Sequence, residues 1–284
     1  MKKLSLILGM MLAVSMVMAQ TTKTTIGQDG VRNVANVTQE ACLSGNPTTI
    51  MAVQAGSWNV LNTSQTGMQN YIELRQAGVQ NKANMEQLTC DVAWEGSGSA
   101  GGTNTADIYQ TGTYGKANLS QKETVDGTVV PPNPDLSNNV ARATQSGNDN
   151  TYNLDQGSRT WKPTNFSTLT QTGNRNMAGI DQFGATNYSN IKQFGMYNKA
   201  NLDQHNKNIF NTPTTWWSKS YSTQTNKGNL LNVLQHGNAN LQYAESYQNG
   251  NANKTNIKQV SMQTQLVAAV QHGTDIINVT QIDE

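Results

Sequence analysis

Glutamine recurs at intervals of eleven residues along much of this 284-residue chain, and this spacing constrains the fold more than any other feature. Two unbroken series show it: Gln54, Gln65, Gln76 and Gln87, and Gln171, Gln182, Gln193 and Gln204. Each unit reads Asn-x-apolar-x-apolar-x-Gln and ends in a turn. Apolar residues alternating with polar ones have the period of two that belongs to a β-strand. Each unit is therefore predicted to be one short strand, with about twenty strands in all.

The connections between the predicted strands alternate between two kinds. Every second connection has four residues, and most of these carry glycine in the second place, where a tight arc needs positive φ or close backbone approach. These turn glycines are Gly30, Gly56, Gly78, Gly112, Gly147, Gly173, Gly195 and Gly250. The other connections range from four residues after Gln65 to more than a dozen after Gln87 and Gln204. Because insertions collect on every second connection only, two strands and two turns are predicted to make one coil with a tight edge and a decorated edge.

This pattern predicts an all-β solenoid of about ten two-strand coils, each of about 22 residues and adding about 4.8 Å through parallel pairing. Its body would be about 45 to 50 Å long. Stacked side-chain amides can hydrogen-bond along the axis, which offsets the cost of burying them. The predicted ladder residues are Asn33, Gln39, Asn59, Gln65, Asn81, Gln87, Asn150, Gln156, Asn176, Gln182, Asn198, Gln204, Asn229, Gln235, Asn253 and Gln259. A further series of outward asparagines, from Asn36 to Asn278 with Gly179 as the exception, is either a lateral docking surface or additional stacking.

The start of the chain has the pattern of a secretory signal. Lys2 and Lys3 precede an apolar run from Leu4 to Val17, and small-residue chemistry at Ala19 predicts cleavage before Gln20. We therefore expect residues 1–19 to be a signal peptide and residues 20–284 to be the repeat domain, with no membrane insertion. The charged fraction of 13% and the formal net charge of +1 give no electrostatic footprint for nucleic acid.

The combined motif Asn-x-Ala-x-x-x-Gln and Gln-x-Gly-x-x-Asn, in paired strands behind a secretory signal, resembles the curlin repeat of curli fibre subunits. The resemblance extends from about Thr22 to Gln281. It implies a bacterial functional amyloid that is exported by curli-type secretion machinery and polymerises at the cell surface with itself or with a related curlin subunit or nucleator. It also implies a role in biofilm matrix and adhesion. The chain departs from the familiar subunits in its larger number of coils and in long insertions such as Lys122 to Asn138.

Candidate reactive side chains are sparse, and no catalytic, cofactor or metal site is predicted. His205 and His236 are placed on the decorated edge and His272 on the tight edge, which excludes a three-histidine metal site. Outward carboxylates at Asp155, Asp181, Asp203 and Glu86 are interpreted as solvated charges that discourage association between sheets.

Two further features fall in the insertions. Cys42 and Cys90 lie in loops two coils apart, where we expect either a disulfide that staples the loops or two free or intermolecular thiols. Trp161 and the pair Trp216 and Trp217 either bind a glycan or partner or fold back on the solenoid.

The sequence thus favours an extracellular structural subunit that polymerises through its terminal coils, residues 22–39 and 265–281. The alternative is a monomeric or minor solenoid adhesin that binds glycan or matrix through its edge loops. An ice-binding solenoid would need a flat outward threonine array, and a polysaccharide lyase or hydrolase would need a cluster of acid, base and metal ligand. Neither pattern is present in the sequence.

Overall fold

A computed structural model describes residues 14–16, 22–40, 48–67, 69–89, 103–123, 138–158, 164–184, 186–206, 217–237, 241–260 and 265–282. The internal residues outside these ranges all fall between an odd-numbered strand and the next even-numbered one. Strands and turns make up the described residues, and no helix capable of crossing a membrane is found among them.

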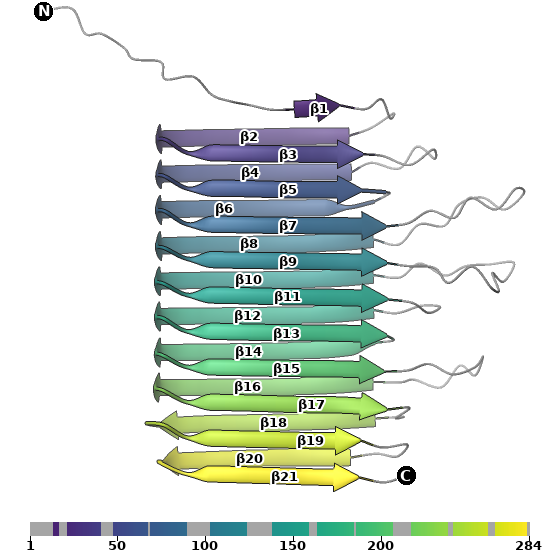
Figure 1. Cartoon of the computed structure of the whole chain (residues 1–284), viewed down its shortest axis with the longest axis vertical. Coiled ribbons are helices and arrows are strands. Elements are labelled where there is room, and N and C mark those ends of the chain that lie inside the picture. The colour runs from purple at the N-terminus through teal and green to yellow at the C-terminus, as the bar shows by residue number, and fades with distance from the viewer. Residues whose placement is uncertain are drawn as a thin grey trace, which may run out of the picture.

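The strands form two parallel sheets that lie face to face, and consecutive strands alternate between them (Figure 1). The even-numbered sheet contains β2 (Thr22–Val31), β4 (Thr48–Ser57), β6 (Tyr71–Val79), β8 (Thr103–Thr113), β10 (Asn138–Asn148), β12 (Thr164–Asn174), β14 (Asn187–Met196), β16 (Trp217–Lys227), β18 (Leu241–Gly250) and β20 (Gln265–Gly273). The odd-numbered sheet contains β1 (Val14–Met16), β3 (Val34–Glu40), β5 (Val60–Thr66), β7 (Lys82–Thr89), β9 (Lys116–Glu123), β11 (Thr151–Ser158), β13 (Met177–Gly184), β15 (Lys199–Asn206), β17 (Leu230–Gly237), β19 (Lys254–Val260) and β21 (Ile276–Ile282). The prediction of an all-β solenoid built from two-strand coils is confirmed, and ten coils run from β2–β3 to β20–β21.

Every pair of neighbouring strands is in register with respect to the sequence motif. Gln54, for example, pairs with Gln28 on one side and with Gln76 on the other. Side chains alternate between buried and exposed along each strand, as the pleat requires. A shift of one residue would turn the whole buried set outward, so the repeat itself specifies the register.

The tight edge, which joins each even-numbered strand to the following odd-numbered one, depends on glycine. Gly78 has φ of 115°, and a Cβ atom built on it would lie 2.0 Å from the backbone oxygen of Gly112 in the next coil. No other residue fits such an approach without moving the backbone. The eight predicted turn glycines all have positive φ, and Asn226 replaces glycine at this place in the eighth coil with φ of 79°.

The structure places three residues of the predicted signal peptide beside the solenoid. Val14–Met16 forms β1, which pairs in parallel with residues 37–39 of β3 at the end of the odd-numbered sheet. The physical reason is that β3 would otherwise present an unpaired row of backbone donors and acceptors, to which an apolar extended segment can add. Cleavage before Gln20 stays a prediction.

The interior is one thin layer of side chains between the two sheets. Each repeat strand contributes two central residues to it, mostly Ala, Ile, Leu, Val or Ser. The buried glutamine follows two residues after the second of them. Among the described residues Tyr152, in β11, is the largest side chain that is fully buried there. The other strand of its coil, β10, carries the small residues Ala141 and Ala143 at the buried positions. Its hydroxyl lies 3.4 Å from Ser167 Oγ, and burial raises the pKa of this phenol above its ordinary value.

Candidate functional site: amide ladders and open ends

Two continuous ladders of buried glutamine run the length of the stack, one in each sheet. Each Nε2 donates to Oε1 of the glutamine in the next coil over 2.7 to 2.9 Å, and only the final step, from Gln259 to Gln281, is longer, at 3.2 Å. The second Nε2 hydrogen goes to a backbone carbonyl of the facing sheet, as from Gln76 to Val60 O in the preceding coil. Because all their hydrogen-bonding groups have partners, these buried amides stabilise the stack and do not incur the cost of unpaired polar groups.

The predicted asparagines at the start of the odd-numbered strands form a different ladder. Asn59 Oδ1 accepts from the backbone N–H of Asn81 at 3.1 Å, and Asn59 Nδ2 donates to Ala55 O and Gly78 O. The same bonds recur at the equivalent corners, which ties each tight turn to the turn of the next coil. Gly115 and Asp275 take the asparagine's place in the fourth and tenth coils, where their backbone N–H groups still donate to Oδ1 of the asparagine in the preceding coil.

The outward asparagines of the odd-numbered sheet line a shallow groove of about 1100 Å³ along its outer face. They are linked head to tail at 2.7 to 2.9 Å from Asn36 to Asn153 and again from Asn201 to Asn278. Gly179 lies between the two runs and interrupts them. These side chains therefore stack, as one of the two sequence interpretations expects, and they do so on an exposed surface.

The two ends of the stack lack the covering coil that every interior coil has. Leu231 and Val233 are buried in the eighth coil, whereas Ile277 and Val279 at the matching positions of β21 are only partly buried. Ile276 beside them is 70% exposed. An open strand edge with apolar side chains behind it is a template for pairing with another strand.

The two features predicted in the insertions lie partly or wholly outside the described residues. The residues concerned are Cys42, Cys90, Trp161 and Trp216. Their pairing and contacts therefore stay predictions.

The structure separates the histidines as the sequence register indicates but also joins two of them with an aspartate. His272 lies on the tight edge against Tyr247, at 5.9 Å between ring centroids, whereas His205 and His236 stack on the opposite edge at 4.8 Å. The Asp203 carboxylate lies beside the Nε2 atoms of both rings. Sequence reasoning tested only a three-histidine site and missed this mixed cluster, although an Asp and a His two residues apart on one strand share a face.

Residues 164–195 and 173–205 match the model of the curlin associated repeat. These two overlapping stretches cover β12 to β15 and contain two consecutive coils of the solenoid. This part of the chain therefore carries curlin-type repeats, and the same in-register motif continues through the other coils. The comparison with curated proteins gave no match.

Proposed function

We propose that this chain is a secreted structural subunit that polymerises end to end into extracellular curli-like amyloid fibres. The observation that carries the proposal is the open C-terminal end, where β20 and β21 have unpaired edges and Ile277 and Val279 are only partly covered. At the other end β2 has an unpaired edge and Ile26 is partly buried. The curlin-type repeats support a structural role and not an enzymatic one.

The hydrogen-bond ladders give the stack a direction that suits head-to-tail addition. In the two glutamine ladders and the outward asparagine ladder the amide nitrogen donates toward the C-terminal end. A shorter buried series in the even-numbered sheet, from Asn104 to Asn187, donates in the opposite direction and stays inside the stack. The last members, Gln271, Gln281 and Asn278, thus end the stack with NH₂ groups, while Gln28 and Asn36 begin it with carbonyl oxygens. A second copy that places its first coil on β20–β21 would continue the two glutamine ladders and the outward asparagine ladder with donor facing acceptor.

The N-terminal end fits the same scheme if the signal is removed. Cleavage before Gln20 takes away β1 and leaves the whole edge of β3 open for the C-terminal coil of another copy. Export through curli-type secretion machinery, addition to itself or to a related nucleator, and a role in biofilm matrix and adhesion belong to this proposal.

Val279→Asp tests the proposal by adding a charge inside the open end. Val279 faces the interior of the last coil, whereas Thr280 beside it faces outward, so Thr280→Asp is a matched control of equal charge. Burying an unpaired carboxylate under an added coil is costly. We expect seeded elongation, followed by thioflavin fluorescence, to slow at least tenfold in Val279→Asp and to stay within a factor of two in Thr280→Asp. Equal elongation of both variants would contradict end-to-end addition and favour a monomeric adhesin.

A further inference from the structure

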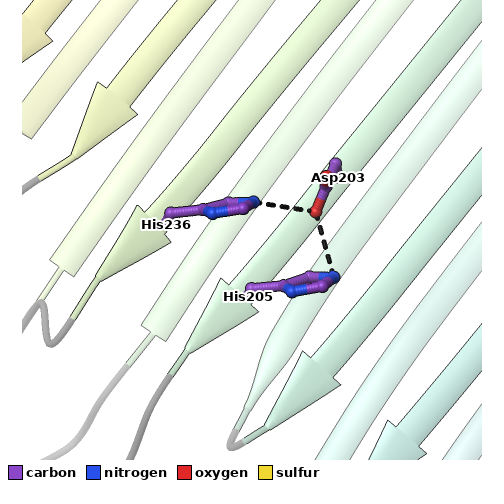
Figure 2. A group of neighbouring side chains, drawn as sticks. All are labelled: Asp203, His205 and His236. Carbon is purple, nitrogen blue, oxygen red and sulfur yellow. Dashed lines mark hydrogen bonds and ion pairs between the residues drawn. The ribbon is translucent and has the colours of Figure 1, made fainter.

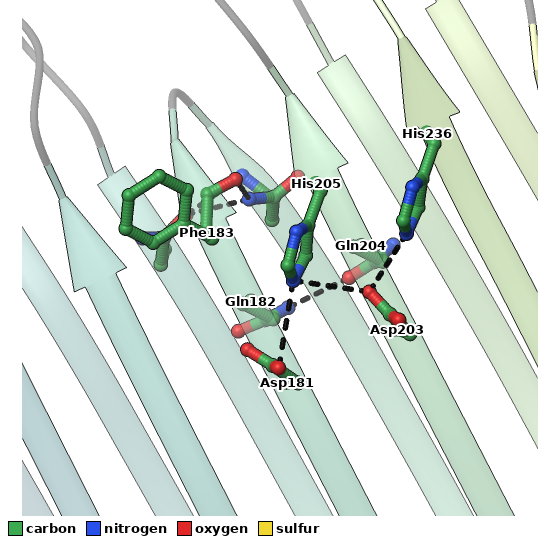
Figure 3. Close-up of polar contacts among 9 residues, drawn as sticks. Asp181, Gln182, Phe183, Asp203, Gln204, His205 and His236 are labelled. Carbon is green, nitrogen blue, oxygen red and sulfur yellow. Dashed lines mark hydrogen bonds and ion pairs between the residues drawn. The ribbon is translucent and has the colours of Figure 1, made fainter.

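Four polar side chains from three successive coils converge on the outer face of the odd-numbered sheet, near the decorated edge. Asp181 comes from β13, Asp203 and His205 from β15, and His236 from β17 (Figure 3). The strand register places Asp181 beside Asp203 and His205 beside His236. Residues two apart on one strand share a face, so the two columns lie next to each other.

The ligand-type atoms of this cluster point toward one another. Asp203 Oδ1 lies 3.1 Å from His205 Nε2 and 3.1 Å from His236 Nε2 (Figure 2). The two imidazole rings are stacked with an interplanar angle of 5°, and Asp181 Oδ2 lies 3.4 Å from His205 Nε2. The three atoms of Asp203, His205 and His236 all fall within 4.8 Å of one another.

The Nε2 atoms of both histidines point at carboxylate oxygens. His236 Nε2 is hydrogen-bonded to Asp203, and His205 Nε2, an atom shielded from solvent, is paired with both Asp181 and Asp203. Phe183 packs on the other side of the His205 ring, at 5.7 Å between centroids, and shields it. Two imidazole nitrogens that converge on one carboxylate oxygen, one of them shielded from solvent, have the arrangement of a set of metal ligands.

The charge around the cluster favours a cation. Asp155, Asp181 and Asp203 form one column on neighbouring strands, and among the described residues the ion pairs of Asp181 and Asp203 go only to the two histidines. A bound cation would relieve the repulsion within this column.

We propose that Asp203, His205 and His236 bind one divalent transition-metal ion, Zn²⁺ or Cu²⁺, with Asp181 as the nearest additional carboxylate. Imidazole and carboxylate together suit such ions. Bonds of about 2.0 to 2.1 Å in a tetrahedral site hold ligand atoms about 3.3 Å apart, close to the two 3.1 Å separations here. The Nε2 atoms of His205 and His236 are at most 4.8 Å apart, so they need to approach each other by at most about 1.5 Å to bind one ion. Half-exposed side chains can make this movement by rotating about their χ angles.

The ion would join β15 to β17 and so tie the seventh coil to the eighth. It would add a metal cross-link along the solenoid axis to the hydrogen bond that already joins Gln204 to Gln235. The cross-link would occur once per subunit in any assembly. The site does not depend on polymerisation, because all its ligands come from one chain.

The test is metal titration of the untagged full chain with its cysteines alkylated, so that neither a tag nor Cys42 and Cys90 can bind the ion. We expect one Zn²⁺ per chain by calorimetry, and Cu²⁺ spectra with nitrogen hyperfine structure from two imidazoles. His205→Gln and His236→Gln should each weaken Zn²⁺ binding at least tenfold. His272→Gln is the matched control and should leave it unchanged.

Two readouts separate loss of the site from loss of the fold. Because His236 is outward-facing, His236→Gln should keep the far-ultraviolet circular dichroism of the unchanged chain. Asp203→Asn retains the size of the side chain and should weaken binding in the same way. Binding that is lost equally in His272→Gln, or that persists in both His205→Gln and His236→Gln, would overturn the proposal.

Discussion

A buried glutamine in this solenoid uses both of its amide hydrogens and its carbonyl oxygen. Gln145 Nε2 donates to Gln171 Oε1 at 2.8 Å and to Lys116 O at 3.1 Å, while its Oε1 accepts from Gln110. No other residue type offers two donors and one acceptor on a side chain of this length. Glutamine therefore recurs because its side chain can satisfy all of its hydrogen-bonding groups in the buried interior.

Replacing Gln145 with Glu should destabilise the chain in a pH-dependent way. At pH 7 a buried carboxylate would face Lys116 O and Gln171 Oε1, which are both acceptors, at a cost of about 3 kcal/mol or more. Burial raises the carboxyl pKa in the folded chain above its unfolded value of about 4.3. The folded state then binds more protons between these two pKa values, so the loss of stability should shrink as the pH falls toward 4.

Urea midpoints at pH 7 and pH 4 measure this effect. Thr144→Glu is the control, because Thr144 is the exposed neighbour on the same strand, and it should change stability by less than about 0.5 kcal/mol. An equal loss in both variants, or a loss in Gln145→Glu that does not vary with pH, would show that the ladder is not a buried network.

Gly179→Asn should stabilise the stack by closing the gap in the outward asparagine ladder. A Cβ at Gly179 meets only Asn201 Oδ1, at 3.5 Å, so there is room for the side chain. Two new hydrogen bonds, to Asn153 and Asn201, should contribute about 1 to 2 kcal/mol beyond Gly179→Ala, which removes the flexibility of glycine without adding an amide. Equal stability of the two variants in urea would mean that the outward ladder contributes nothing to stability.

A coil is the smallest element with a complete interior, because its two strands fill the space between the sheets together. In the third coil β6 contributes Ile72 and Leu74 while β7 contributes Ala83 and Met85. In the fifth coil β10 contributes only alanines, and Tyr152 on β11 occupies the volume. Large side chains on one strand are thus balanced by small ones on the other.

Tyr152→Ala should therefore leave a cavity and cost about 3 to 5 kcal/mol. The strand register makes Ala141 equivalent to Ile72, and Tyr152 equivalent to Ala83. Adding Ala141→Ile to Tyr152→Ala reproduces the pair found in the third coil and should recover at least about 1 kcal/mol. If Ala141→Ile destabilises Tyr152→Ala further in urea unfolding, the two strands do not share one packed interior.

The strands, their pairing and the alternation of tight and decorated edges could be predicted from the sequence because each follows from a repeated spacing. The break at Gly179 was visible for the same reason. The direction of the ladders, the balance of Tyr152 against Ala141 and the convergence of Asp203 with His205 and His236 could not, since they depend on atoms from different coils. β1 was also missed, because an apolar leader and an edge strand have the same composition.

In the described part of the chain the solenoid is a one-dimensional stack in which the main contacts of each coil are with its neighbours. Excising residues 176–197, which is one coil of 22 residues, joins Arg175 to Asn198 and preserves the order of turns and sheets. We expect the shortened chain to fold, with its body reduced by about 4.8 Å. Excising only residues 176–186, which is 11 residues or one strand, moves every later strand to the other sheet and places the insertions on the tight edge.

Circular dichroism and limited proteolysis distinguish these two deletions. The chain that lacks one coil should keep its β-sheet spectrum and its protease resistance, and the chain that lacks one strand should lose protease resistance beyond residue 175. Equal resistance in the two deletions would mean that the single strand, and not the coil, is the repeating unit.

The central claim, that a solenoid with two open ends adds copies of itself, is tested most directly by seeded assembly. The purified chain would be diluted from denaturant, followed by thioflavin fluorescence with and without preformed seeds, and the product examined by fibre diffraction. The account predicts a lag phase that seeds shorten, and reflections near about 4.7 Å along the fibre and about 10 Å across it. A β-rich monomer that stays soluble at high concentration in the presence of seeds would contradict it.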